Sequence, residues 1–239
     1  MVKDYKSQQT IFFKNKPKIK ACYALVGKKE GEGNFKNYFD HILKDDLFGE
    51  KSYEKAERKM LETTIYGAIN KAKLKANQID ALIAGDLMNQ IISSSFSARD
   101  LDSGFLGLYG ACSTMAESLI IGGLLIDGKY LNNVACATGS HFSSVEKQYR
   151  YPLELGNQRP PVSQWTVTGS GCTILSRTGS DVCLTSATLG KVTDYGITDA
   201  NNMGAAMAPA IDIIGLCGMI LPRISNTKIY IKEELKVSA

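Results

Sequence analysis

The most regular pattern of apolar and polar positions lies between residues 52 and 75. Apolar or small side chains recur there every four residues, at Ala56, Met60, Thr64, Ala68 and Ala72, with Leu61, Ile65 and Ile69 beside them. This spacing predicts an amphipathic helix with one buried stripe. Ser52 stands directly before the helix and can cap its first turn, and we expect the helix to reach about Lys75.

Short apolar runs bounded by turn residues predict strands in six places. They cover residues 21–27, 79–85, 104–109, 134–138, 168–175 and 182–188. Helical patterns lie between several of them, a short one at 95–101 and the most apolar one at 115–126. Strands that alternate with helices are typical of an α/β fold with a mostly parallel sheet, which is the architecture we predict.

The helix predicted at 115–126 is apolar around nearly its whole circumference. Glu117 and Ser118 are its only clearly polar residues. A helix that is apolar on all sides has to be buried on all sides. Because one sheet covers only one side of a helix, the sequence predicts a second layer over the opposite side.

Polar side chains follow three of the predicted strands. The clusters are Asp86 with Asn89 and Gln90, Cys112 with Ser113, and Ser140 with His141. Ligands of α/β sheets gather at the carboxyl ends of the strands, so these clusters are candidates for one binding site. Each cluster could equally consist of loop side chains that hydrogen-bond to nearby backbone groups and bind no ligand. A long polar and aromatic loop, predicted at 146–165, adds Arg150 as a possible partner for a carboxylate.

Cys112 stands between a predicted strand and the first turn of the apolar helix. Unpaired backbone N–H groups and the positive end of the helix dipole favour a thiolate there, which suits a nucleophilic or anion-binding cysteine. The other interpretation is a buried structural thiol, because free cysteine is among the most buried residue types. On spacing alone, we expect the buried thiol.

Composition narrows the possible functions. The 239 residues carry a formal charge of +4, which is too mild to indicate nucleic-acid binding. Six cysteines contain no Cys-x-x-Cys pair, and His41 and His141 are far apart, so we expect no metal, no cofactor and no disulfide framework. The N-terminus is charged and lacks the apolar core of a signal peptide, so we expect a cytosolic protein that is not secreted.

Two features bear on membranes. Lysines cluster near the start of the chain, which indicates a solvated face or, where they converge in space, a weak attraction to an anionic membrane surface. The apolar stretch 203–221 approaches the length of a membrane span, but Pro209 and the central Asp212 argue against one. We therefore predict at most peripheral association with a membrane.

Several long motifs resemble those of the stage V sporulation protein AD family of spore-forming bacteria. They are DLMNQ at 86–90, GLYGACST at 107–114, the Ser140-His141 pair, VEKQYRYP at 145–152, QWTVTG at 164–169 and NMGAAMAPA at 202–210. The resemblance covers roughly residues 10 to 210. It implies a thiolase-like fold, in which two similar αβ halves pack as a five-layer αβαβα sandwich.

The resemblance also implies a division of the chain. Residues 1–181 would form the thiolase-like N-terminal half, 182–210 the start of a second half, and 211–239 an unmatched tail. In thiolases and ketoacyl synthases, the cysteine at the position of Cys112 is the acyl-accepting nucleophile, and its partners come from the second half. We therefore expect a C-terminally truncated member that does not catalyse acyl transfer.

The family's implied role is the binding of dipicolinic acid, alone or as its calcium chelate, during uptake into the forespore. The ligand-binding residues would be Asp86, Asn89, Cys112, Ser140, His141 and Arg150. The expected partners are other proteins of the same operon and a second copy bound through the first-half sheet, and the expected location is peripheral to the inner spore membrane. The alternative function is an acyltransferase that uses Cys112.

Overall fold

A mixed β-sheet forms the centre of the computed structural model, which describes residues 10–149, 166–179, 181–190, 196, 198 and 228–232. For residues 146–149 and 228–232, it describes the backbone alone. The strands are β1 (Thr10–Phe12), β2 (Lys18–Val26), β3 (His41–Ile42), β4 (Ala81–Asp86), β5 (Gly104–Gly107), β6 (Asn133–Ser140), β7 (Gly169–Ser176), β8 (Cys183–Thr188) and β9 (Lys228–Lys232). The main order is β1-β8-β2-β7-β6-β4-β5, with β3 beside β2 and β9 beside β8.

The strand directions differ from the mostly parallel sheet that alternation predicts. Among the described strands, β2/β3, β4/β5, β4/β6 and β8/β9 pair in parallel, whereas β1/β8, β2/β7, β2/β8 and β6/β7 pair antiparallel. The sequence prediction was wrong here because β7 runs antiparallel to both of its neighbours, β2 and β6, in the middle of the sheet. β8 lies beyond the predicted boundary at residue 181 and pairs within the same sheet, so the boundary stays a prediction.

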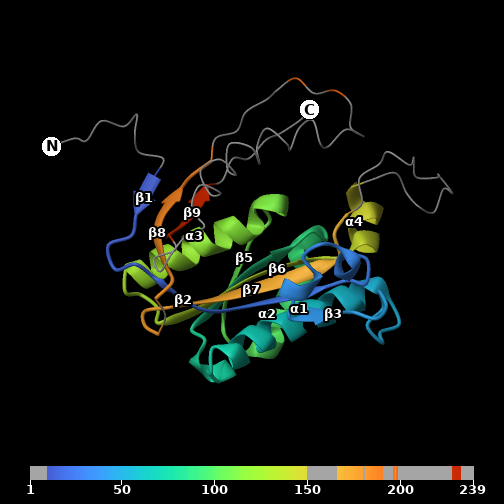
Figure 1. Cartoon of the computed structure of the whole chain (residues 1–239), viewed down its shortest axis with the longest axis horizontal. Helices are drawn as coiled ribbons and strands as arrows, with labels where there is room; N and C mark the ends of the chain where they lie inside the picture. Colours follow the sequence, from blue (N-terminus) through green and yellow to red (C-terminus); the bar gives the residue numbers. More distant parts are fainter. Residues whose placement is uncertain are drawn as a thin grey trace.

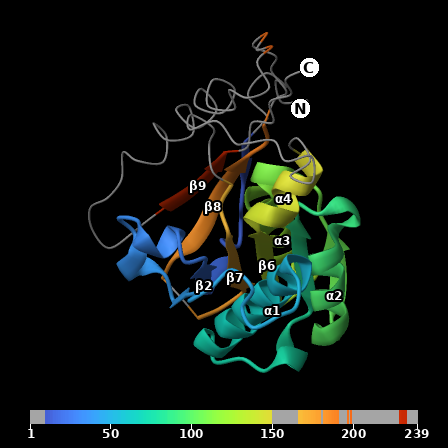
Figure 2. The same ribbon diagram turned by 90° about the vertical axis from the view of Figure 1, so that its right-hand side faces the viewer.

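Four α-helices accompany the described part of the sheet. They are α1 (Tyr53–Lys71), α2 (Ile92–Leu101), α3 (Thr114–Asp127) and α4 (Phe142–Tyr149). α1 and α2 cover one face of the sheet and α3 covers the other (Figure 1). The view along the strands shows the resulting three layers (Figure 2).

The helix boundaries confirm most of the predicted elements and correct others. The Ser52 side chain caps α1 by accepting a hydrogen bond of 3.3 Å from the Lys55 N–H. α1 ends at Lys71, before the predicted Lys75, because Lys73 adopts the left-handed region at φ 56°. α2 begins at Ile92 instead of residue 95, and α4 includes residues 146–149, which were predicted as loop. The strands β1, β3 and β9 were not predicted.

The core is divided by the sheet into two clusters. Alternate residues of β4 and β6, including Leu82, Ala84, Ala135 and Ala137, pack against α1 and α2. The intervening residues, including Ile83, Val134 and Cys136, pack against α3. This alternation of side chains along a strand identifies the face on which each nearby polar residue lies.

α3 is buried along one flank only within the described residues. Ile120 and Ile126 are buried against the sheet, whereas Leu124 is 40% exposed, and Leu119 and Ile121 are half-buried. The expected burial on all sides is therefore wrong for this part of the molecule, because no described element covers the outer flank. No helix in the described ranges combines the length and apolar character that a bilayer span requires. The stretch 203–221 lies outside those ranges.

Candidate functional site

The carboxyl ends of β4, β5 and β6 lie at one edge of the sheet because these strands are parallel neighbours. α4 follows β6 at this edge, on the right in Figure 1. The three polar clusters predicted from the sequence follow the same three strands, so each cluster is located at this edge. The edge is consequently the candidate site that the topology favours.

Cys112 lies in a short 3₁₀ turn, Ala111–Ser113, directly before α3. Its side chain is exposed, so the expectation of a buried thiol is wrong. Its predecessor Ala111 has φ 48°, in the left-handed region that a residue with a Cβ seldom occupies. Ser113 holds the turn by donating a 2.7 Å hydrogen bond to the Gly110 carbonyl. The turn thus presents Cys112 to solvent at the amino end of a 14-residue helix.

The acidic residue Glu117 lies in the first turn of α3. A Cβ placed on Gly110 would lie 2.6 Å from a Glu117 carboxylate oxygen, so this charge is adjacent to the Cys112 turn. A carboxylate at that position already interacts with the positive end of the helix dipole. It therefore reduces the attraction of the turn for a second anion.

Asp86 lies on the opposite face of the sheet from α3. It follows Leu82 and Ala84 in the alternation of β4, and its oxygens accept hydrogen bonds from the Met88 N–H at 3.1 Å and from the N–H and hydroxyl of Ser94 at 2.8 and 2.7 Å. Burial raises the pKa of this carboxyl above its usual value, and the hydrogen bonds offset only part of that rise. Asp86 fixes the start of α2 and does not face Cys112.

His141 lies on the same side of the sheet as Asp86. Its ring is fully buried, with its centroid 5.0 Å from that of Tyr53 on α1. Nε2 donates to the Asp46 carbonyl at 2.8 Å, and Nδ1 accepts from the Ser143 N–H at 3.2 Å, an assignment that follows from the two partners. Burial lowers the pKa of His141. With both nitrogens engaged, the ring offers none to a ligand in this conformation.

The remaining predicted residues are spread along the edge. Ser140 lies on the α3 face, in alternation with Val134 and Cys136, and its hydroxyl donates to the Val167 carbonyl at 2.7 Å. Asn89 is exposed in the turn before α2. Arg150 lies outside the described residues. The structure therefore places Cys112 and Ser140 on one face, and Asp86 and His141 on the other.

A second polar cluster escaped the sequence prediction. Glu57 of α1 is only 1% exposed, and it lies close enough to Asp86 for that charge to raise its pKa further. Helical spacing already placed Glu57 on the buried face of α1, because it lies three residues before Met60 and seven before Thr64. Within the described residues, no group of three or more His, Cys, Asp or Glu side chains is arranged to hold a metal ion.

The mixed sheet, with α1 and α2 on one face and α3 on the other, defines a layered α/β protein with an exposed cysteine at the amino end of an apolar helix. The family model for stage V sporulation protein AD matches residues 7–216. The chain is also 41% identical over 203 residues to stage V sporulation protein AD of Bacillus subtilis (strain 168). This chain therefore belongs to the stage V sporulation protein AD family.

The match covers 85% of this chain and 60% of the Bacillus relative, so the chain spans less than two thirds of that protein's length. Among solved structures, 3-oxoacyl-[acyl-carrier-protein] synthase III from Aquifex aeolicus is 13% identical at a TM-score of 0.48, covering 69% of this chain and 55% of that one. Xanthomonas campestris OleA, as its E117Q variant, is 13% identical at a TM-score of 0.45, covering 70% and 59%. Likeness at this level does not extend to activity.

Proposed function

We propose that this chain acts in spore formation as a binding protein for dipicolinic acid, alone or as its calcium chelate, and not as an acyltransferase. Membership in the sporulation family supports the first part. The observation that carries the second is the surroundings of Cys112. The chain has two histidines, and neither accompanies this exposed thiol: His141 is buried on the other face of the sheet, and His41 lies in β3, paired with β2.

The Cys112 turn supplies part of what a flat dicarboxylate requires. The positive end of the α3 helix dipole attracts one carboxylate. Ser140 lies on the same face of the sheet, and its hydroxyl would donate to the ligand in place of the Val167 carbonyl. The first-turn carboxylate of Glu117 opposes this attraction, and a calcium ion chelated by dipicolinate would reduce the repulsion. In this proposal, the chelate binds more tightly than the free acid.

Titration calorimetry with dipicolinate, with and without equimolar calcium, tests this proposal on the full chain. We expect measurable heat in the millimolar range, and weaker binding for Cys112→Ala. Cys22→Ala is the matched control, because Cys22 is also an exposed cysteine but lies on β2. Isophthalate, which has the same two carboxylates without the ring nitrogen, should bind more weakly. No heat and no thermal shift with dipicolinate would remove the proposal.

Acyl transfer is the second candidate, and the exposure of Cys112 favours it. A cysteine nucleophile needs a base within hydrogen-bond reach to form the thiolate and accept its proton. Incubation with an acyl-CoA, followed by intact-mass measurement, decides between the two functions. A stable adduct that maps to Cys112 and is lost in Cys112→Ala would support the enzyme. An unmodified mass is the result that we expect.

The proposal extends to location and assembly. We place the chain on the cytoplasmic side, peripheral to the forespore or inner spore membrane, with other proteins of the same operon as partners. A second copy would bind through β5, which pairs only with β4 among the described strands and leaves Leu106 45% exposed. An exposed strand edge with an apolar side chain is a template for pairing with another chain.

A further inference from the structure

Basic side chains are concentrated at the end of the sheet opposite the Cys112 edge, where β6 begins and β7 ends. Three connections meet there: residues 13–17 between β1 and β2, 128–132 between α3 and β6, and 177–182 between β7 and β8. Six cationic side chains on or beside these connections form no ion pair within the described part of the chain. We call them the basic end: Lys14, Lys16, Lys18, Lys20, Lys129 and Arg177.

Hydrogen bonds hold these connections against one another. The Arg177 N–H donates to the Asn132 carbonyl at 3.1 Å, and the Arg177 guanidinium donates to the Lys129 carbonyl. The side-chain amide of Asn15 donates to the Asp127 carbonyl at the end of α3, at 2.6 Å. The basic residues of all three connections are therefore neighbours in space, although up to 163 positions separate Lys14 from Arg177 in the chain.

The two lysines of β2 belong to the same group. Lys18 is the first residue of β2 and pairs with Ser176 at the end of β7. A Cβ placed on Gly179, between β7 and β8, would lie 3.7 Å from the Lys20 Nζ. The lysines near the start of the chain thus converge in space. This is the condition under which such a cluster attracts an anionic surface.

Fewer acidic groups lie at this end. Asp127 accepts a hydrogen bond from the Asn15 N–H, and Asp80 accepts one of 2.6 Å from the Asn132 N–H. Asp181 is exposed. Six cations against three carboxylates leave an excess of three positive charges, out of the formal +4 of the whole chain. The positive charge of the protein is therefore unevenly distributed and favours a negatively charged partner at this end.

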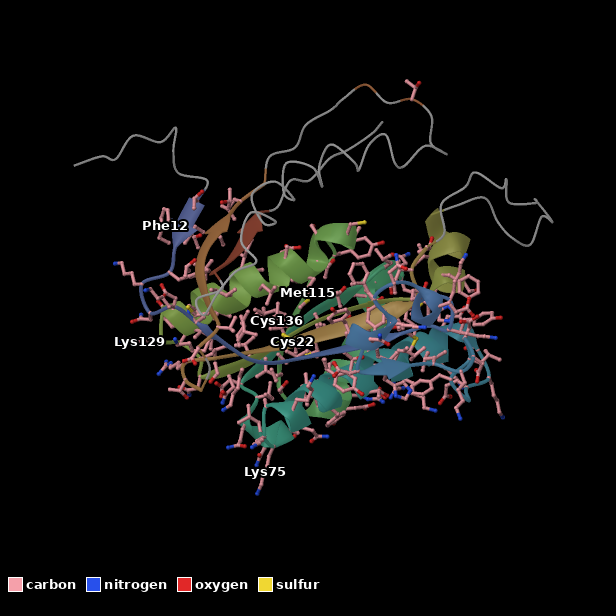
Figure 3. The ribbon with its side chains drawn as sticks, viewed as in Figure 1. Phe12, Cys22, Lys75, Met115, Lys129 and Cys136 are labelled. Atoms are coloured by element: carbon pink, nitrogen blue, oxygen red, sulfur yellow. The ribbon has the colours of Figure 1, made fainter. Side chains whose placement is uncertain are left out.

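Two exposed aromatic side chains accompany the lysines. Phe12, in β1 directly before the first connection, is 75% exposed, and Tyr130, directly after Lys129, is 79% exposed. Figure 3 shows Phe12 and Lys129 at the same end of the molecule. Aromatic rings at the surface of a bilayer lie at the level of the headgroups, where their apolar bodies leave water. Exposed rings among unpaired lysines are thus suited to a lipid surface.

We infer that the basic end, together with Phe12 and Tyr130, is the surface through which this protein binds an anionic lipid bilayer. Lysines are flexible point charges that need no fixed geometry, which suits a fluid layer of headgroups. The inference rests on the peripheral location proposed above and specifies the surface of contact. Because the basic end and Cys112 lie at opposite ends of α3, whose 14 residues span about 20 Å, the candidate site faces away from the lipid.

Co-sedimentation of the full chain with lipid vesicles measures this binding. Phosphatidylcholine with about one third phosphatidylglycerol supplies the negative surface, and pure phosphatidylcholine is the neutral reference. We expect at least about tenfold stronger binding to the anionic vesicles at about 0.05 M salt, and loss of the difference at about 0.5 M, because salt screens exposed charges. Equal binding to both kinds of vesicle, or binding to neither, would overturn the inference.

Two double variants with the same change in net charge locate the contact. Lys14→Gln/Lys16→Gln should weaken binding to anionic vesicles about 10- to 30-fold, since each basic residue near the surface contributes about fivefold. Both lysines are exposed, so the fold should persist. Lys44→Gln/Lys51→Gln is the control, because these exposed lysines lie beyond β3 and before α1, towards the opposite end. It should change binding by less than about threefold.

Further measurements separate this inference from its alternatives. Tyr130→Ser, which leaves the charge unchanged, should also weaken binding to anionic vesicles. Lys14→Gln/Lys16→Gln should bind dipicolinate as the native chain does, so either proposal can fail alone. Equal losses in the two double variants would show an effect of net charge without a defined surface. Tighter binding to duplex DNA or to polyglutamate than to the vesicles, at the same salt concentration, would assign the basic end to another partner.

Discussion

At the scale of single residues, burial decides which cysteines can react. Cys136 and Cys172 lie in the core, where burial raises the pKa of the Cys136 thiol to about 12 and that of Cys172 well above its usual value. Figure 3 shows Cys136 between α3 and the sheet. Cys112 and Cys22 are exposed. All four have the same side chain, so only position distinguishes their chemistry.

Alkylation should follow this order. With iodoacetamide at pH 8, we expect Cys112 and Cys22 to be modified at least about 10-fold faster than Cys136 and Cys172, because the buried thiols react only when the fold opens. Peptide mapping by mass spectrometry at several times gives the rates. The same reaction in 6 M guanidinium should remove the difference. Similar rates in the native protein would contradict the exposure of Cys112.

Glu57 should make stability depend on pH. Its pKa is raised from 4.5 to about 8, so the folded chain keeps a proton that the unfolded chain releases. Stability from this carboxyl is fully present below pH 4.5 and is lost as the pH rises towards 8. The shift corresponds to about 5 kcal/mol of unfolding free energy.

Urea denaturation checks this effect. Glu57→Gln should match the native chain near pH 4.5 and be more stable by a few kcal/mol at pH 8.5, because the amide never ionises. Glu62→Gln, at the exposed ion pair, should follow the pH dependence of the native chain. Parallel curves for Glu57→Gln and the native chain would show that Glu57 is not buried as described.

At the scale of elements, two glycines set the distance between α3 and the sheet. A Cβ on Gly122 would lie 2.8 Å from the Cys136 sulfur, and a Cβ on Gly123 would lie 2.9 Å from the Phe13 ring. Both distances are shorter than real contacts of a Cβ atom. The absence of side chains at these two positions therefore lets the helix backbone approach β6 and the β1–β2 connection.

Gly122→Ala should destabilise the protein even though alanine favours helices by about 1 kcal/mol. We expect a net loss of about 1 to 3 kcal/mol in unfolding free energy, because the new methyl group overfills the contact with Cys136. The double variant Gly122→Ala/Cys136→Ala should recover part of the loss relative to the sum of the single variants. Chemical denaturation of all four proteins measures this coupling. A neutral or stabilising Gly122→Ala would contradict the close approach of α3.

At the scale of the whole molecule, the apolar surface that remains exposed predicts association. Leu106 at the β5 edge is 45% exposed, and Tyr109, which follows that strand, is 56% exposed. Under the proposed pairing through β5, the full chain should elute as a dimer in size-exclusion chromatography with light scattering. Leu106→Lys should give a monomer, because a charge at the strand edge opposes pairing.

Leu124→Lys is the control for the dimer. Leu124 is 40% exposed on the outer flank of α3, so it matches Leu106 in residue type and exposure but lies away from the strand edge. It should leave the dimer intact. A monomeric native chain, or dissociation caused by Leu124→Lys and not by Leu106→Lys, would place the association elsewhere.

Local sequence patterns were sufficient to predict most of the helices and strands, and to predict that Cys112 lies between a strand and a helix. The apolar stripe of α1, the Ser52 cap and the apolar runs of β2, β4, β6, β7 and β8 depend on residues near one another in sequence, where periodicity acts directly. The strand-to-helix junction at Cys112 was visible for the same reason. The family motifs surround these elements and led to the family that the comparison confirms.

The tertiary structure alone decided strand direction, exposure and the grouping of polar residues. Asp86 and His141 follow strands of the same edge as Cys112, yet alternation turns them to the α1 and α2 face. Alternation shows which residues of a strand share a face. It does not show which helix covers that face, because helix packing depends on contacts between residues far apart in the sequence. Glu57 became significant only beside Asp86, 29 positions later in the chain. Burial and charge act through space, so a one-dimensional pattern does not determine them.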